Sequence, residues 1–479
     1  NFHSQAGKIE YILIKMQTDN KKNFSIFIIL HIILWTAIPT ILNTNLSLDT
    51  IEVLTWGNEL KLGYDKFPPV FPLFTELFYK IFGNQDWAYY LLSQLFVVTC
   101  FVVVFKFSKY FFDKDIYGLL SVLLLECIYF FNYTTPELNG FIALLPFIAL
   151  TALFCWKSII RNNSFDWIMF GVFAGISTLT WYLALYLLAS IAIFFIREII
   201  ITKKINYKYF LALLFYFLIL SPHLYFVFEN NAKSIEYAFF RSFGDPLSGV
   251  SSLKIADHLI YPLIFLIKQS LILVPVFILL RFATSSFKIK INLDDKKLIF
   301  LFTICLLPII LMLITSLVGG VRIRTMWMTT FYVFPGVFFV YLFKKNINID
   351  KLKSFFKAFL FIFLILPIVY GFDSYFQKDK RNDFPGKKIA ANVQNVWNNN
   401  FSNKIEVVAG EGWVYGVWYA GNLSYHLKNR PIFQYHVKDD DRVGNIRVDA
   451  LNNINNCKGI LLKLEPYYES CLNGLKISE

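Results

Sequence analysis

A succession of long apolar runs limits what this chain can fold into more than any other feature. A helix needs about 20 apolar residues to cross a bilayer. The 479-residue chain is 56% hydrophobic and 19% aromatic, which is unlike a soluble domain. We predict membrane segments at residues 24–42, 87–106, 116–131, 138–156, 166–196, 207–228, 258–280, 298–317, 326–343 and 354–373. The sequence therefore predicts an all-α polytopic membrane protein with about 11–13 membrane helices.

Charge gives this path a direction. The formal net charge is +13, but the basic residues lie in short clusters between apolar runs, where the positive-inside rule accounts for them. Lys21 and Lys22 precede the first span, which places the N-terminus inside and the loop at residues 43–86 outside. On this path every predicted inner loop is basic. The distribution indicates a lipid bilayer as partner and argues against nucleic acid.

The apolar run 166–196 has basic residues at both ends, Arg161 before it and Arg197 after it. A single tilted helix would place one of these clusters outside. We therefore predict two half-length helices with a break near Thr180, Trp181 and Tyr182, which other helices must bury.

Composition changes near residue 373, where polar residues increase. The runs at 405–408 and 459–463 alternate as strands do. We predict a cytoplasmic segment at 1–23, a transmembrane domain at 24–373 and a small extracytoplasmic α/β domain at 374–479. Residues 1–15 precede a natural start at Met16, and whether they are native stays open. So does a disulfide between Cys457 and Cys471.

The loop at 43–86 holds the strongest candidates for chemistry. Asp49 and Glu52 are three residues apart, so on a helix their carboxylates share a face. A carboxylate at a membrane surface can act as a general base or bind a cation beside a phosphate. Solvated charge on an amphipathic helix is the simpler alternative. Glu137 lies at the outer start of a span, where it could meet this loop or only cap a helix.

Basic residues on the outer side are also informative, because the positive-inside rule does not favour them there. Arg322 and Arg324 precede a late span, Arg241 lies in the outer loop 229–257, and Lys66 follows the first carboxylates. Arginine suits bidentate phosphate binding, although contact with lipid headgroups alone is an equal alternative. Glu126 is different, since it lies within an apolar segment. It either lines a cavity or makes a structural polar contact between helices.

Several segments together carry a resemblance to a known family. They are Asp49 with Trp56, Leu62-Gly63-Tyr64, Pro68-Pro69, Phe82-Gly83, Trp87, Thr135-Pro136-Glu137, Ser221-Pro222-His223-Leu224 and the segment from Arg322 to Trp327. In order and spacing the chain resembles the polyprenyl-phosphate-sugar-dependent glycosyltransferases of the GT-C superfold. That group includes protein O-mannosyltransferases and lipid A aminoarabinose transferases.

The resemblance implies inverting transfer of a sugar from a polyprenyl-phosphate donor to an extracytoplasmic acceptor, which is lipid A, another glycan or a protein hydroxyl. It implies a catalytic role for Asp49 with Glu137, and Glu52 is a further candidate because Thr50 stands where the family commonly has an acid. We assign substrate binding to Tyr64, Asp65, Lys66, Arg241, Arg322, Arg324 and Trp327. Lys66 is one place out of register with the family pattern.

The resemblance also implies a bacterial inner (plasma) membrane location with the active site on the periplasmic side. No metal is required, although Asp49, Glu52 and Glu137 could bind one. A lipid-linked sugar flippase and an O-antigen-type polymerase or ligase are the alternatives. The donor sugar, the acceptor and the oligomeric state stay open.

Overall fold

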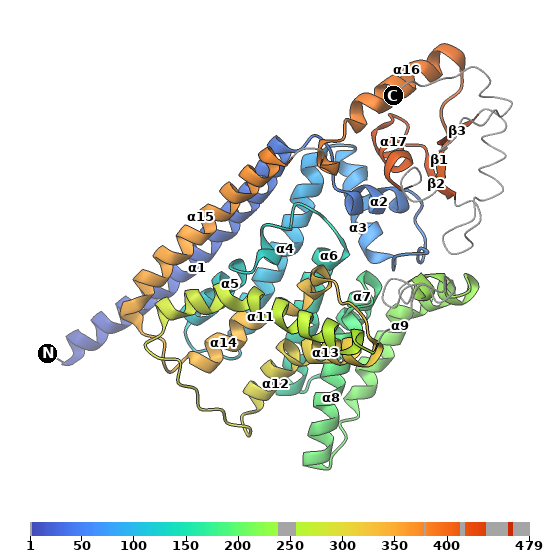
Figure 1. The fold of residues 1–479 in the computed structure, drawn as a ribbon. Helices are drawn as coiled ribbons and strands as arrows, with labels where there is room; N and C mark the ends of the chain where they lie inside the picture. Colours follow the sequence, from blue (N-terminus) through green and yellow to red (C-terminus); the bar gives the residue numbers. More distant parts are fainter. Residues whose placement is uncertain (1, 238–254, 378–379, 412–416, 437–457, 463–479) are drawn as a thin grey trace.

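The computed structural model describes residues 2–237, 255–377, 380–411, 417–436 and 458–462 (Figure 1). Its α-helices are α1 (Phe2–Leu42), α2 (Leu48–Gly57), α3 (Val70–Phe82), α4 (Asp86–Ser108), α5 (Asp115–Glu126), α6 (Gly140–Arg161), α7 (Ser164–Thr180), α8 (Ala184–Thr202), α9 (Lys208–Glu229), α11 (Asp257–Ala283), α12 (Lys296–Cys305), α13 (Leu307–Gly319), α14 (Pro335–Phe343), α15 (Leu352–Phe376), α16 (Gly386–Asn400) and α17 (Gly421–His426). The strands are β1 (Val407–Glu411), β2 (Ile432–His436) and β3 (Gly459–Leu462). Short 3-10 helices occupy Tyr129–Phe131 (η1), Thr325–Tyr332 (η2), Ile349–Lys351 (η3) and Arg381–Asp383 (η4).

The predicted all-α membrane fold is confirmed, but the predicted number of about 11–13 membrane helices is larger than the number of spans that qualify in the described residues. Among the described residues, seven helices are long and apolar enough to cross a bilayer, or up to nine spans if each bent pair counts as one. The predicted span 298–317 divides into α12 and α13 with a 43° bend, and 326–343 divides into η2 and α14 with a 55° bend. Proline explains both bends, because Pro308 and Pro335 each stand in the first turn of the second helix. The predicted span 116–131 is a helix of only 12 residues, α5.

The predicted break in the run 166–196 is confirmed, because α7 ends at Thr180 and α8 begins at Ala184. The two helices have 17 and 19 residues, so they are longer than the half-length pair we predicted. The Trp181 ring fills the break and lies against Gly140, where a Cβ atom would come within 2.2 Å of the ring. A glycine at position 140 therefore lets the first turn of α6 pack directly against the Trp181 ring.

The C-terminal domain, as we call α16, α17 and β1 to β3, contains a parallel three-stranded sheet in the order β2-β1-β3. Val407 pairs with Ile432 on one side and with Gly459 on the other. β1 covers only the second half of the run predicted at 405–408, and β3 covers most of the run predicted at 459–463. Cys457 and Cys471 lie outside the described residues, whereas the cysteines of the apolar segments are free and buried.

The C-terminal domain sits on α2 and α3, which lie between it and the membrane helices (Figure 1). Buried polar contacts make this junction. The Asn45 Nδ2 atom donates to Asn422 Oδ1 at 2.8 Å, and the Tyr425 hydroxyl donates to Asp86 Oδ1 at 2.8 Å. Because such groups are costly to bury unpaired, the contacts fix how the domain meets the first outer loop.

Glu126 makes a structural contact rather than lining either of the cavities described below. Its Oε2 atom lies 3.1 Å from His31 Nδ1 on α1, and His31 Nε2 lies 3.1 Å from Gln94 Oε1 on α4. Gln94 Nε2 then donates to Thr135 Oγ1 at 3.1 Å. All four side chains are fully buried. The contacts therefore connect α1, α4 and α5 to the segment that carries Glu137.

Replacing one member of this buried pair should destabilise the protein. His31→Leu leaves the buried Glu126 carboxyl without its polar partner, at a cost of about 1–3 kcal/mol. We expect a lower thermal unfolding temperature in detergent for His31→Leu, and substantial recovery in the double variant His31→Leu/Glu126→Leu. A single variant as stable as wild type would contradict this assignment.

Candidate active site

Asp49 and Glu52 both lie on α2, but they have different surroundings. Asp49 is in the first turn and borders a large cavity. Glu52 is buried, with 1% of its side chain exposed, and borders neither cavity described here. The predicted shared face therefore holds only in part, and of the two carboxylates only Asp49 faces the larger cavity.

Glu52 instead forms a buried ion pair with Lys66. The Lys66 Nζ atom lies 2.7 Å from Glu52 Oε1 and 2.5 Å from Oε2. Burial raises the pKa of Glu52, an effect that Lys66 opposes. Burial works against the charge on Lys66, but the Glu52 charge raises the pKa of Lys66 above its ordinary value. The pair fixes a protonated lysine at the cavity wall, which assigns Glu52 a positioning role.

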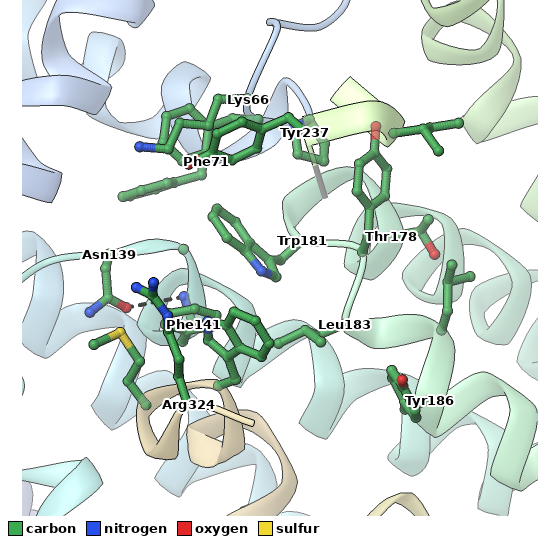
Figure 2. A pocket seen from close by; sticks show the side chains of 18 of the residues that line it. Lys66, Phe71, Asn139, Phe141, Thr178, Trp181, Leu183, Tyr186, Tyr237 and Arg324 are labelled. Carbon is green, nitrogen blue, oxygen red and sulfur yellow. Dashed lines mark hydrogen bonds between the residues drawn. The ribbon is translucent and has the colours of Figure 1, made fainter. Parts of the chain in front are cut away.

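The first cavity, of about 610 Å³, has mainly aromatic and aliphatic walls. Its polar and charged positions come from separate parts of the chain: Asp49, Lys66, Asn139, Thr178, His223, Thr315 and Arg324. Figure 2 shows Trp181 between the Lys66 and Arg324 side chains. Trp327 also borders this cavity, as predicted for a binding residue. The arrangement suits a ligand with a long apolar part and an anionic group.

His223 organises one wall of the first cavity. Its Nε2 atom lies 2.6 Å from the Tyr182 hydroxyl and its Nδ1 atom lies 2.8 Å from the Leu62 carbonyl. Since the carbonyl only accepts, Nδ1 carries the proton and Nε2 accepts from the tyrosine. This histidine therefore joins the helix break, α9 and the first outer loop, a role that sequence reasoning missed.

A second cavity, of about 320 Å³, is more polar. It is lined by Ser47, Leu48, Glu137, Gln377, Lys380, Arg381 and Asn382. Leu48 borders this cavity while the next residue, Asp49, borders the first one. The start of α2 thus forms part of the wall between the two cavities.

Thr50 ties the segments that carry the two candidate acids. Its hydroxyl donates to the Leu138 carbonyl at 3.1 Å and lies 2.8 Å from Ser47 Oγ. Leu138 follows Glu137 directly, so this bond sets where Glu137 stands relative to α2. The resemblance led us to expect an acid at this position, and Thr50 makes a structural bond there instead.

Glu137 has an unusual charge environment. The residue is exposed at the second cavity, but neighbouring protein atoms remove much of the water around its carboxyl group. This burial and repulsion from Asp49 raise the pKa of Glu137 to about 7, against an opposing effect of Arg381. Glu137 therefore changes charge near neutral pH, and the charge on Asp49 influences this ionisation.

The rate of sugar transfer, the activity that the resemblance implies, should depend on this ionisation if the charged form of Glu137 assists Asp49. Below a pH of about 7 the carboxyl is protonated, so we expect the rate to rise with pH through a midpoint near 7. Glu137→Gln should give a low rate without this step, whereas Glu59→Gln should retain it. Rates measured from pH of about 5.5 to 8.5 test this. An unchanged step in Glu137→Gln would assign the ionisation to another group.

Other predicted binding residues lie elsewhere. Tyr64 is buried within the outer loop, where its hydroxyl donates to the Glu59 carbonyl at 2.8 Å. Asp65 borders neither cavity. Arg322 borders neither cavity, although Val321 and Ile323 on either side of it border the first. These placements do not support binding roles for Tyr64, Asp65 or Arg322. Arg241 lies outside the described residues.

Lys380 and Arg381 are the candidates that we missed. They follow the last predicted outward span, where basic residues are as unexpected as Arg324. That signal was available in the sequence. Among the described residues, no group of three or more His, Cys, Asp or Glu side chains could hold a metal ion.

Comparison with known proteins agrees with this architecture. Residues 66–226 match the family model described as dolichyl-phosphate-mannose-protein mannosyltransferase. The fold is similar to the crystal structure of ArnT from Cupriavidus metallidurans bound to undecaprenyl phosphate, with a TM-score of 0.61, 11% identity and 92% of each chain covered. The apo state of ArnT from the same organism gives a TM-score of 0.50, with 11% identity and 92% of this chain and 93% of that chain covered. No curated protein sequence matches significantly.

The chain therefore shares the fold of ArnT, and about a third of its length matches the mannosyltransferase family model. The apolar helices of the described residues agree with a multi-pass membrane protein.

Proposed function

We propose that this protein transfers a sugar from a polyprenyl-phosphate donor to a hydroxyl of an extracytoplasmic acceptor, with inversion at the sugar. The observation that carries the proposal is the first cavity, where Asp49 shares an otherwise largely apolar space with Lys66 and Arg324. Its aromatic and aliphatic walls match an isoprenoid chain, and its cations match a phosphate. The fold similarity to ArnT bound to undecaprenyl phosphate supports the same class of donor.

The reaction follows from these groups. Asp49 accepts the proton of the acceptor hydroxyl, whose oxygen attacks the anomeric carbon. The bond between that carbon and the phosphate oxygen breaks, and polyprenyl phosphate leaves with the negative charge. Lys66 and Arg324 stabilise this charge as it develops, which is the type of preorganised contact that commonly contributes most to catalysis.

The second cavity is suited to the acceptor. It meets the first cavity at the start of α2, so a hydroxyl from that side would reach Asp49. Lipid A, another glycan and a protein hydroxyl are the acceptor classes that we propose. The positive-inside pattern of the sequence supports an extracytoplasmic position for both cavities, and we propose the bacterial inner membrane with a periplasmic active site.

The test is transfer in membranes that contain the protein. A panel of polyprenyl-phosphate sugars, each radiolabelled in the sugar, is added to membranes with and without the chain. We expect at least one donor to label a lipid, glycan or protein fraction only when the chain is present. Failure of every donor across a broad panel would reject the proposal.

A further inference from the structure

Arg430 of the C-terminal domain contacts both helices of the first outer loop. Its NH1 atom lies 2.7 Å from Glu76 Oε2 on α3, and its NH2 atom donates to the Leu54 carbonyl of α2 at 2.8 Å. The guanidinium carbon lies 3.5 Å from the Tyr79 ring centroid. One side chain of a distant sequence segment thus joins α2 to α3.

The contact is enclosed and is made at a cost to the backbone. Only 10% of the Arg430 side chain and 7% of the Glu76 side chain are exposed. Arg430 has a φ of 45°, in the left-handed region that residues other than glycine usually avoid. The Arg430 carbonyl also accepts from Asn58 Nδ2 at 3.3 Å. Such a conformation persists where surrounding contacts determine it, which marks this residue as a fixed part of the junction.

One buried ion pair joins α2 to the chain before α3, and a second joins α3 to Arg430, which also bonds to α2 through the Leu54 carbonyl. Glu52 and Lys66 form the pair at the cavity, and Glu76 and Arg430 form the pair at the C-terminal domain. Asp49 lies at the start of α2, whereas the direct packing of α2 on α3 is at the other end, where Gly57 lies against Pro72. If the second pair is lost, α2 can shift relative to α3, and Asp49 and Lys66 shift relative to one another.

We propose that Arg430 is a positioning residue for the reaction: through α2 and α3 it holds Asp49 and Lys66 in their working geometry. The C-terminal domain is then needed for the chemical step and not only for choosing the acceptor. This inference rests on the proposed function, because it assumes that Asp49 and Lys66 act in sugar transfer. A shift of about 1 Å in a reacting group can lower a rate about 100-fold.

The test compares Arg430→Gln, Arg430→Lys and Glu76→Gln in the full-length protein. Lys458→Gln is the matched control, because Lys458 is a cation of the same domain that pairs with Glu406 at 3.8 Å on the surface. Transfer rate is measured against donor concentration. Hydrogen exchange is measured separately for α2 and for α16, so that one readout does not depend on activity.

We expect Arg430→Gln to lower kcat by about tenfold or more and to leave the donor KM within about twofold. Exchange in α2 should rise while exchange in α16 stays unchanged. Arg430→Lys should recover part of kcat, Glu76→Gln should show a smaller loss of the same kind, and Lys458→Gln should match wild type.

Two results would overturn the proposal. One is a folded Arg430→Gln protein with kcat within about twofold of wild type. The other is unchanged exchange in α2 in all three variants. If wild type transfers no sugar, the proposed function fails. Faster hydrogen exchange in α2 of the variants would still show that Arg430 fixes α2, so the two failures can be told apart.

Discussion

Asp49→Asn is expected to lower sugar transfer by a factor of about 10²–10⁴, the contribution typical of a positioned general base. Asparagine has nearly the same shape but cannot accept the hydroxyl proton, so donor binding should stay close to that of wild type. Initial rates with a labelled donor, together with direct binding of polyprenyl phosphate to the purified protein, separate these two effects.

Asp65→Asn is the matched control, because it removes a carboxylate from the same outer loop at a position that borders neither cavity. It should retain transfer within about twofold. An equal loss of transfer rate in Asp49→Asn and Asp65→Asn would mean that the net charge of the loop determines the rate. Asp49 would then not be the general base.

Lys66→Met is expected to lower both stability and transfer. It leaves the Glu52 carboxyl, of which 1% is exposed, without its partner. Removing one member of a buried ion pair typically costs about 3–5 kcal/mol. It also removes a cation from the cavity wall, and loss of one preorganised charge contact commonly costs about 10²–10³ in rate.

The double variant Glu52→Leu/Lys66→Met separates these effects, because it removes the unpaired carboxyl. Thermal unfolding in detergent should then recover toward wild type, while transfer should stay low. If transfer recovered together with stability, the lysine would have only a structural role. The binding of the donor phosphate would then rest on Arg324.

Much of the membrane architecture could be predicted because lipid imposes simple rules on a chain. Apolar length and basic flanks were sufficient to locate the break at Trp181 within a residue or two. They did not predict the bends at Leu306 and before α14, because both halves of each pair are equally apolar. Proline marks these bends, yet Pro146, Pro222 and Pro367 lie inside continuous helices.

The candidate site could be predicted only in part. Asp49, Lys66, Arg324 and Trp327 come together at one cavity from three regions of the sequence. Spacing on α2 predicted a shared face for Asp49 and Glu52, but spacing cannot show that Lys66 folds back onto only Glu52. The binding role of Tyr64 stays a prediction, since its position in a motif does not say whether it faces the cavity or, as the structure has it, the loop interior.

The division into two cavities could not be predicted from the sequence, since it depends on tertiary contacts. The Thr50 bond to Leu138 places Glu137 on the far side of the start of α2. Lys380 and Arg381 reach the same cavity from the chain that follows α15. None of these contacts leaves a local pattern.

The central claim is that the protein breaks the bond between the sugar and the lipid phosphate. The most direct measurement uses purified protein in vesicles and a donor with one label in the sugar and a different label in the phosphate. We predict that wild type moves the sugar label to an acceptor while the phosphate label stays with the polyprenyl lipid, and that Asp49→Asn leaves both labels together. Movement of both labels across the bilayer on an intact donor would contradict the account and indicate a flippase.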